Sequence, residues 1–170
     1  MKIFKEVQRF TQTWLVVLII ISGIVPIAII VKEYFEENTT MSTNEFILTL
    51  VGITVSLTFI LFFKLKTRID EKGIHYQFFP FHFSLKTILW SEIKSAKVRT
   101  YDPIGEFGGW GLKGGAFWNS GKGKAINVSG DIGIQLDLKN GKKILIGTKL
   151  LNEANSVLNN YKEKIHTDEN

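Results

Sequence analysis

The residues best suited to binding chemistry lie in one glycine-rich stretch, residues 104–133, which holds ten of the fifteen glycines. Tryptophan, phenylalanine and lysine residues are interleaved with these glycines. Six of them are candidate contacts for a lipid or a protein partner: Trp110, Lys113, Phe117, Trp118, Lys122 and Lys124. Aromatic rings suit a membrane interface, and a lysine close to an anionic leaflet contributes about 1 kcal/mol of binding free energy.

Three interpretations of this stretch stay open at the level of sequence. In the first, Trp110 and Phe117 fold back as lids over the open end of a β-barrel. In the second, the aromatic and lysine side chains meet lipid headgroups. In the third, the tryptophans anchor a protein partner, as tryptophan often does in interfaces. A loop of about twenty residues in a compact domain is usually functional or disordered, and the large aromatic residues argue against disorder.

The sequence offers little support for catalysis. Residues 109–114 match G-x-G-x-x-G, but the residues that follow do not start the helix that dinucleotide binding needs. The chain has no cysteine and three scattered histidines, which disfavours thiolate and histidine metal sites. It has no G-x-S-x-G segment and no identifiable catalytic carboxylate pair. We therefore expect a protein without enzymatic activity, metal or cofactor.

The formal net charge of the 170-residue chain is +5, a balance that suits nucleic acid or an anionic membrane surface. The lysines are spread along the predicted strands, without an arginine-rich cluster or an RNA-binding signature. We therefore expect no nucleic acid partner, and attraction to anionic lipid is the simpler explanation of the charge.

Two apolar runs precede the glycine-rich stretch, at residues 14–31 and 46–63. Each has eighteen residues without a charge, and eighteen residues make about 27 Å of helix, close to the ~30 Å hydrocarbon core of a bilayer. The first run is longer than the apolar region of a signal peptide. The sequence therefore predicts two transmembrane helices. Gly52 and Ser56 form a small-xxx-small pair that allows close helix approach.

Flanking charges predict the orientation of this hairpin. Three basic residues precede the first run and three follow the second: Lys2, Lys5, Arg9, Lys64, Lys66 and Arg68. The connecting segment 32–45 has four glutamates and one lysine. By the positive-inside rule, segment 1–13 and the C-terminal part are cytoplasmic and segment 32–45 is external.

The remaining residues predict a mainly-β domain over 64–164, followed by a polar tail, 165–170. Apolar and polar residues alternate in about seven short strands linked by short turns, which is typical of an antiparallel sandwich or a partly open barrel. Asn140-Gly141 is the strongest hairpin signal. From about Lys149 the apolar residues recur at helical spacing, which predicts a C-terminal amphipathic helix.

Four stretches resemble a family of small bacterial membrane proteins that have two N-terminal helices and a bacterial pleckstrin-homology-like (PH-like) domain. They are residues 67–81 (TRIDEKGIHYQFFPF), 87–98 (TILWSEIKSAKV), 101–113 (YDPIGEFGGWGLK) and 126–148 (INVSGDIGIQLDLKNGKKILIGT). The resemblance implies a PH-like fold with a C-terminal helix, and a location in the bacterial inner membrane. It implies no particular activity or ligand.

Together these features predict a membrane-anchored, non-catalytic interaction module. Its glycine-rich loop is expected to bind anionic lipid headgroups or a protein partner, which includes a second copy of the chain. An accessory or regulatory subunit of a larger membrane complex is the alternative, with Gly52 and Ser56 as contacts for partner helices. An enzyme with an unrecognised site is the remaining class.

Overall fold

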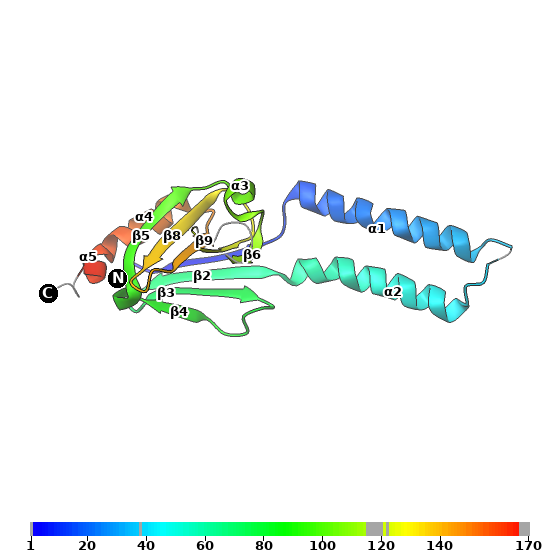
Figure 1. Ribbon diagram of the computed structural model, residues 1–170, viewed down its shortest axis with the longest axis horizontal. Coiled ribbons are helices and arrows are strands. Elements are labelled where there is room, and N and C mark those ends of the chain that lie inside the picture. The colour runs from blue at the N-terminus through cyan, green and yellow to red at the C-terminus, as the bar shows by residue number, and fades with distance from the viewer. Residues whose placement is uncertain (1, 38, 115–120, 122, 167–170) are drawn as a thin grey trace. The chain divides into compact units, whose positions relative to one another are not determined.

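The computed structural model describes residues 2–37, 39–114, 121 and 123–166 (Figure 1). The chain forms two compact units. One is Phe10–Phe63, and the other joins Met1–Arg9 to Lys64–Asn170. The first unit is helical and the second is mainly β, so the β-domain is built from two separate parts of the sequence.

The helical unit is a hairpin of α1 (Thr13–Tyr34) and α2 (Thr43–Phe59), with α2 continued by the short helix η1 (Ile60–Phe62). Both helices are long and apolar enough to cross a membrane, and almost none of their residues is buried. Ser42 and Glu45 form a capping box that fixes the start of α2. The two predicted apolar helices are confirmed, and their exposed apolar surface suggests membrane association.

The close contact inside the hairpin lies at Gly23. A Cβ atom there would stand 2.6 Å from Leu57 Cδ1, so a larger residue would require the Leu57 side chain to move. Around Gly52, by contrast, an added Cβ would meet nothing within 4 Å. The Ser56 hydroxyl donates to the Gly52 carbonyl of its own helix. The Gly52–Ser56 pair lines a groove that it shares with Ser22 and Pro26 of α1, and at Gly52 the groove is open.

The first sheet contains β1 (Phe4–Arg9), β2 (Lys64–Asp70), β3 (Gly73–Phe79) and β4 (Lys86–Leu89), in that order and all antiparallel. Strand β1 was not expected, because the sequence pattern starts the β-domain at residue 64. Its inward positions hold Phe4, Glu6 and Gln8, two of which are polar, so the strand lacks the usual hydrophobic alternation.

Polar contacts join β1 to the C-terminal part of the domain. Glu6 accepts hydrogen bonds from the Thr148 hydroxyl (2.7 Å) and from the Lys149 amide (2.9 Å). The Gln8 side chain donates to the Gly147 carbonyl (2.8 Å). A fragment that starts at residue 64 would lose these bonds and would leave β2 as a free edge.

The second sheet has the order β5-β8-β9-β7-β6. Its strands are β5 (Ile93–Thr100), β6 (Gly111–Gly114), β7 (Lys124–Asn127), β8 (Ile132–Leu138) and β9 (Lys143–Gly147). The β7–β9 pair is parallel, which corrects the expectation of a purely antiparallel domain. The cause is the connection from β7 to β8, which passes over β9 instead of forming a hairpin. The described residues thus form nine strands in two sheets, against about seven expected.

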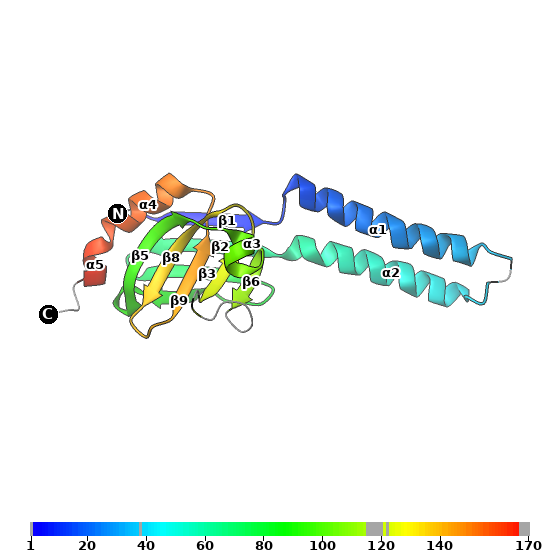
Figure 2. The same cartoon turned by 45° about the horizontal axis from the view of Figure 1, so that its top comes forward.

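Figure 2 shows the two sheets facing one another, with α4 (Leu151–Asn160) and α5 (Lys162–His166) beside them. Large apolar side chains are buried in both sheets, among them Leu65, Ile74, Phe78 and Ile134. Leu145 belongs to a separate buried cluster with Tyr101 and Ala125, against which Phe107 packs. Helix α4 contacts β5, β1 and β8, and buries Ala154, Val157 and Leu158. The expected C-terminal amphipathic helix is confirmed. Trp90, in the short helix η2 (Trp90–Glu92), stacks on Tyr161 at 5.3 Å.

Candidate functional site

The glycine-rich stretch begins with a short helix, α3 (Pro103–Phe107), rather than an open loop. Asp102 caps it: its carboxylate accepts hydrogen bonds from the amides of Ile104 and Gly105, both at 3.0 Å. Gly108 ends the helix with a φ of 71°, a left-handed conformation that favours glycine. The first part of the stretch is therefore ordered by local capping.

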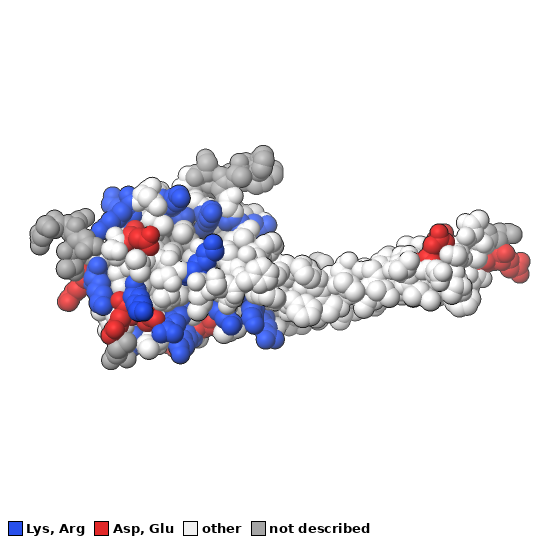
Figure 3. Space-filling view, turned by 90° about the horizontal axis from the view of Figure 1, so that it is seen from below, with Lys and Arg blue, Asp and Glu red and all other residues white. Residues whose placement is uncertain are grey.

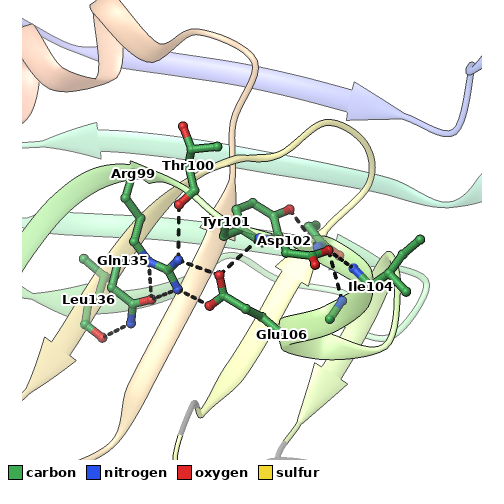
Figure 4. Close-up of polar contacts among 10 residues, drawn as sticks. Arg99, Thr100, Tyr101, Asp102, Ile104, Glu106, Gln135 and Leu136 are labelled. Atoms are coloured by element: carbon green, nitrogen blue, oxygen red, sulfur yellow. Dashed lines mark hydrogen bonds and ion pairs between the residues drawn. The ribbon is translucent and has the colours of Figure 1, made fainter.

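Arg99 on β5 fastens this helix to the second sheet (Figure 4). Its guanidinium donates to both carboxylate oxygens of Glu106, at 3.0 and 2.8 Å, and to the side-chain oxygen of Gln135 on β8, at 3.1 Å. The hydrogen bond and the charge of Glu106 raise the pKa of Arg99 further above its usual range. We call these three side chains the Arg99 clamp. Its charges are matched internally, which indicates a structural role.

Trp110 is half-buried and is tied to the domain by its indole. Its Nε1 donates to the Gly130 carbonyl at 2.9 Å. The next amide, that of Gly111, donates to the side-chain oxygen of Asn127, and Asn127 in turn donates to the Tyr101 hydroxyl, both at 2.8 Å. These bonds favour the interpretation of Trp110 as a packed side chain.

Strands β6 and β7 pair as a hairpin and separate two of the candidate lysines. Lys113 lies opposite Ala125, while Lys124 lies opposite Gly114. Neighbouring residues of a strand point to opposite faces, so Lys113 and Lys124 belong to different faces of the sheet. The other three candidates, Phe117, Trp118 and Lys122, lie outside the described residues.

A pocket of about 670 Å³ adjoins Lys124. We call it the basic pocket, and its lining includes Tyr76, Lys124, Lys142 and Lys143. Glycines and the Asn140-Gly141 turn form much of the remaining wall. No Asp or Glu is among its described lining residues. The sequence pattern identifies only Lys124 of this group, although the Asn-Gly turn before Lys142 and Lys143 is a visible signal.

The parallel pairing of β7 and β9 places Lys124 beside the start of β9, close in the fold to Lys142 and Lys143, although the side chains of Lys124 and Lys143 belong to opposite faces of the sheet. Lys124 is in register with Ile144, the residue after Lys143. Gly123 has a φ of 79°, and a Cβ atom there would collide with the Lys143 carbonyl oxygen. The two backbones can therefore approach closely only because residue 123 is glycine. Non-local strand pairing of this kind is not visible in sequence periodicity.

The electrostatics of the basic pocket favour an anion. Burial raises the pKa of Tyr76, so its phenol stays neutral and can donate a hydrogen bond. Burial, followed by the charges of Lys86 and Lys124, lowers the pKa of nearby His82. The ion pairs found among the described residues include neither Lys124 nor Lys142 nor Lys143. Figure 3 shows one side of the β-domain, over which Lys and Arg are spread with Asp and Glu among them.

A second polar cluster joins three strands of the first sheet. His75 on β3 lies between Asp70 of β2 (2.9 Å) and Thr87 of β4 (2.8 Å). Arg68 pairs with the other Asp70 oxygen at 2.7 Å. Burial opposes ionisation of Asp70, but hydrogen bonds from His75 and the Lys72 amide, with the charges of His75 and Arg68, lower its pKa. A carboxylate, an imidazole and a hydroxyl in hydrogen-bonded sequence can relay a proton. The pairing of strands that brings these three side chains together cannot be predicted from local sequence patterns.

A comparison with protein-family models found no match. Comparisons with curated proteins and with solved structures likewise returned no match. The resemblance to PH-like membrane proteins thus gains no support from these comparisons. On the structure alone, the chain has two long apolar helices, then a mainly-β region with two sheets and a C-terminal helix, and within that region a pocket lined by three lysines.

Proposed function

We propose that this chain is a membrane-anchored, non-catalytic binding module. Its two apolar helices cross the membrane, and its β-domain, a variant of the PH-like fold, lies at the cytoplasmic surface. There the basic pocket binds the phosphate group of an anionic lipid headgroup. The observation that carries the proposal is the presence of three lysines and a tyrosine in the lining of one pocket without a described carboxylate in its wall.

Membrane anchoring rests on the length, composition and exposure of the two helices. Their mean hydropathy reaches 3.0 and 2.1, and their apolar side chains have no protein core to cover them. Water would penalise this surface, whereas a bilayer accommodates it. The basic residues at both outer ends support the cytoplasmic placement of both termini.

The PH-like assignment rests on the order of elements. That fold agrees with the order seen here: three strands of the first sheet, then a second sheet, and then a terminal helix that packs on the domain. Strand β1 and the inserted β6–β7 hairpin are additions to it. The hairpin matters most, because it supplies Lys124 to the basic pocket.

The pocket chemistry favours a phosphate over a carboxylate or a nucleic acid backbone. Lysine binds phosphate as a point charge, and three lysines suit a compact group with more than one oxygen to share. A volume of about 670 Å³ lies within the usual range for small-molecule sites. Binding should weaken with salt, because exposed charges are screened within about 10 Å at 0.1 M ionic strength.

The test uses the full chain in nanodiscs of neutral phosphatidylcholine, since the β-domain needs strand β1. The probe is a soluble short-chain phosphatidylglycerol, added at low and at high salt. Replacement of Lys124, Lys142 and Lys143 by Gln should reduce its affinity by at least tenfold. The control replaces Lys94, Lys97 and Lys162, which are exposed and outside the pocket, and has the same net charge. Equal loss in both triple variants, or no binding by the unmodified chain, would refute the pocket as the site.

An accessory subunit is the second candidate function, and a groove on the helical hairpin favours it. The groove measures about 480 Å³, and its lining includes the small residues Ser22, Gly52 and Ser56. Small residues let a partner helix approach closely in a membrane. Cross-linking in native membranes should then capture one abundant heteromeric partner, and Gly52→Leu should abolish the adduct. Homotypic adducts alone would instead indicate self-association.

A further inference from the structure

The connection between β3 and β4, residues 80–85, exposes an unusual amount of apolar surface. Phe83 is 84% exposed, Phe81 59% and Leu85 48%. We call this segment the apolar loop. No acidic residue occurs in it. Large apolar side chains that gather on a protein surface often mark a site of interaction.

Hydrogen bonds hold the apolar loop in this exposed arrangement. The Gln77 side chain donates to the carbonyls of His82 (3.2 Å) and Phe83 (2.8 Å). The His82 amide donates to the Phe78 carbonyl at 2.8 Å. The Phe83 ring meets the ring of Phe79 edge-on at 6.1 Å. The loop is thus pre-organised, so that binding through it requires little ordering of the chain.

The strand register places this loop at one particular end of the first sheet. Phe79, the last residue of β3, pairs with Lys64, the first residue of β2. Lys64 directly follows the second apolar run, and on its other side it pairs with Arg9, the last residue of β1. The chain therefore leaves the domain toward both apolar helices at the same sheet end from which the loop projects.

The charges around the apolar loop also suit a membrane interface. Lys64 and Lys86 flank it, and the Lys64 ammonium lies 5.9 Å from the centre of the Phe79 ring. His82, inside the loop, has a pKa lowered by burial and by the charges of Lys86 and Lys124, which favours its neutral form. Aromatic residues beside lysines, with no acidic residue among them, are typical of interfacial segments.

We propose that the apolar loop inserts Phe81, Phe83 and Leu85 into the interface of the leaflet in which the second helix ends. The loop then forms a third attachment of the chain to the membrane, beside the two helices, and fixes the orientation of the β-domain on the bilayer. This inference rests on the membrane anchoring in the proposed function, but not on the basic pocket.

The absence of cysteine from the chain makes the test direct. A single cysteine is introduced as Phe83→Cys or Leu85→Cys and carries a nitroxide label in the full chain, reconstituted in phosphatidylcholine–phosphatidylglycerol vesicles. Glu71→Cys is the matched control, because residue 71 lies in the β2–β3 turn at the opposite end of the same sheet. Val55→Cys, an exposed position of α2, reports on the bilayer itself.

The measurement is the accessibility of each label to oxygen, which concentrates in lipid, and to a nickel chelate, which stays in water. We expect the labels at 83 and 85 to favour oxygen, as the label at 55 does, and the label at 71 to favour nickel by at least fivefold. A lipid signal at 55 with a water signal at 83 and 85 would overturn the inference and leave the anchoring intact. A water signal at 55 as well would overturn both.

Discussion

The Arg99 clamp and the basic pocket both place cations beside the glycine-rich stretch, but they differ in how those charges are matched. Arg99 meets the carboxylate of Glu106 at two oxygens within 3.0 Å. The three pocket lysines line one pocket, and no acidic residue is among the described residues of its wall. A positive charge paired with a negative one stabilises the fold. Like charges close to one another repel and destabilise the fold until an anion binds. The difference separates residues that build the domain from residues that are available to a ligand.

The largest expected effect is a loss of stability when a side chain is added where the backbones of β7 and β9 approach each other. Gly123→Ala should lower the free energy of unfolding by about 3 kcal/mol, since a left-handed backbone costs ~1–2 kcal/mol and overpacking ~1–3 kcal/mol more. The loss should appear in thermal unfolding of the full chain in detergent micelles. Gly114→Ala is the control, because its Cβ would stand 3.4 Å or more from its neighbours. A similar loss in both variants would mean that Gly123 has no special role.

The clamp itself should matter for stability and not for binding. Arg99→Ala leaves the partly buried Glu106 without its partner and should destabilise the domain by about 2 kcal/mol. The affinity of the folded protein for short-chain phosphatidylglycerol should stay within twofold. Lys97→Ala, at an exposed position on the same strand, should leave stability unchanged. If Arg99→Ala instead weakened binding without loss of stability, the clamp would belong to the ligand site.

The sequence predicts the elements of this protein better than their pairing. The two apolar helices, the Asn140-Gly141 turn and the amphipathic α4 follow from local composition and periodicity. Strand β1 could not be found this way, because Glu6 and Gln8 point inward to bond Thr148 and Gly147. These contacts join residues about 140 positions apart, and local patterns carry no information on them.

The candidate site shows the same limit. Of the six candidates in the glycine-rich stretch, Lys124 lines the basic pocket, together with Lys142 and Lys143 from outside that stretch. Trp110, a candidate contact because of its aromatic ring, makes an intramolecular hydrogen bond, and its role as a contact stays a prediction. Composition thus indicates a region of the chain that contains candidate residues, whereas the strand register decides which of those residues lie close together.

The stability that the Asp70 cluster contributes should depend on pH. The pKa of Asp70 is lowered in the folded state, so its contribution to stability is complete above the unfolded value of about 3.9 and is lost as the pH falls through the lowered folded value. Asp70→Asn should cost about 1–3 kcal/mol at pH 7. The difference from the unmodified chain should shrink below about pH 4. A difference that stayed constant from pH 7 to pH 3 would contradict a role for the charge.

The smallest effect is expected for a single pocket lysine. Lys143→Gln removes one of three like charges, so the domain should be equally stable or slightly more stable. Its affinity for short-chain phosphatidylglycerol should fall about fivefold at low salt, the equivalent of about 1 kcal/mol for one lysine near an anion. The fall should diminish at high salt, because screening weakens the contribution of each charge. Lys139→Gln, a change of equal charge outside the pocket, should reduce affinity by less than twofold. If Lys143→Gln lowered stability and left affinity unchanged, Lys143 would act as Arg99 does in the clamp. The pocket lysines would then not differ from Arg99 in being available to a ligand.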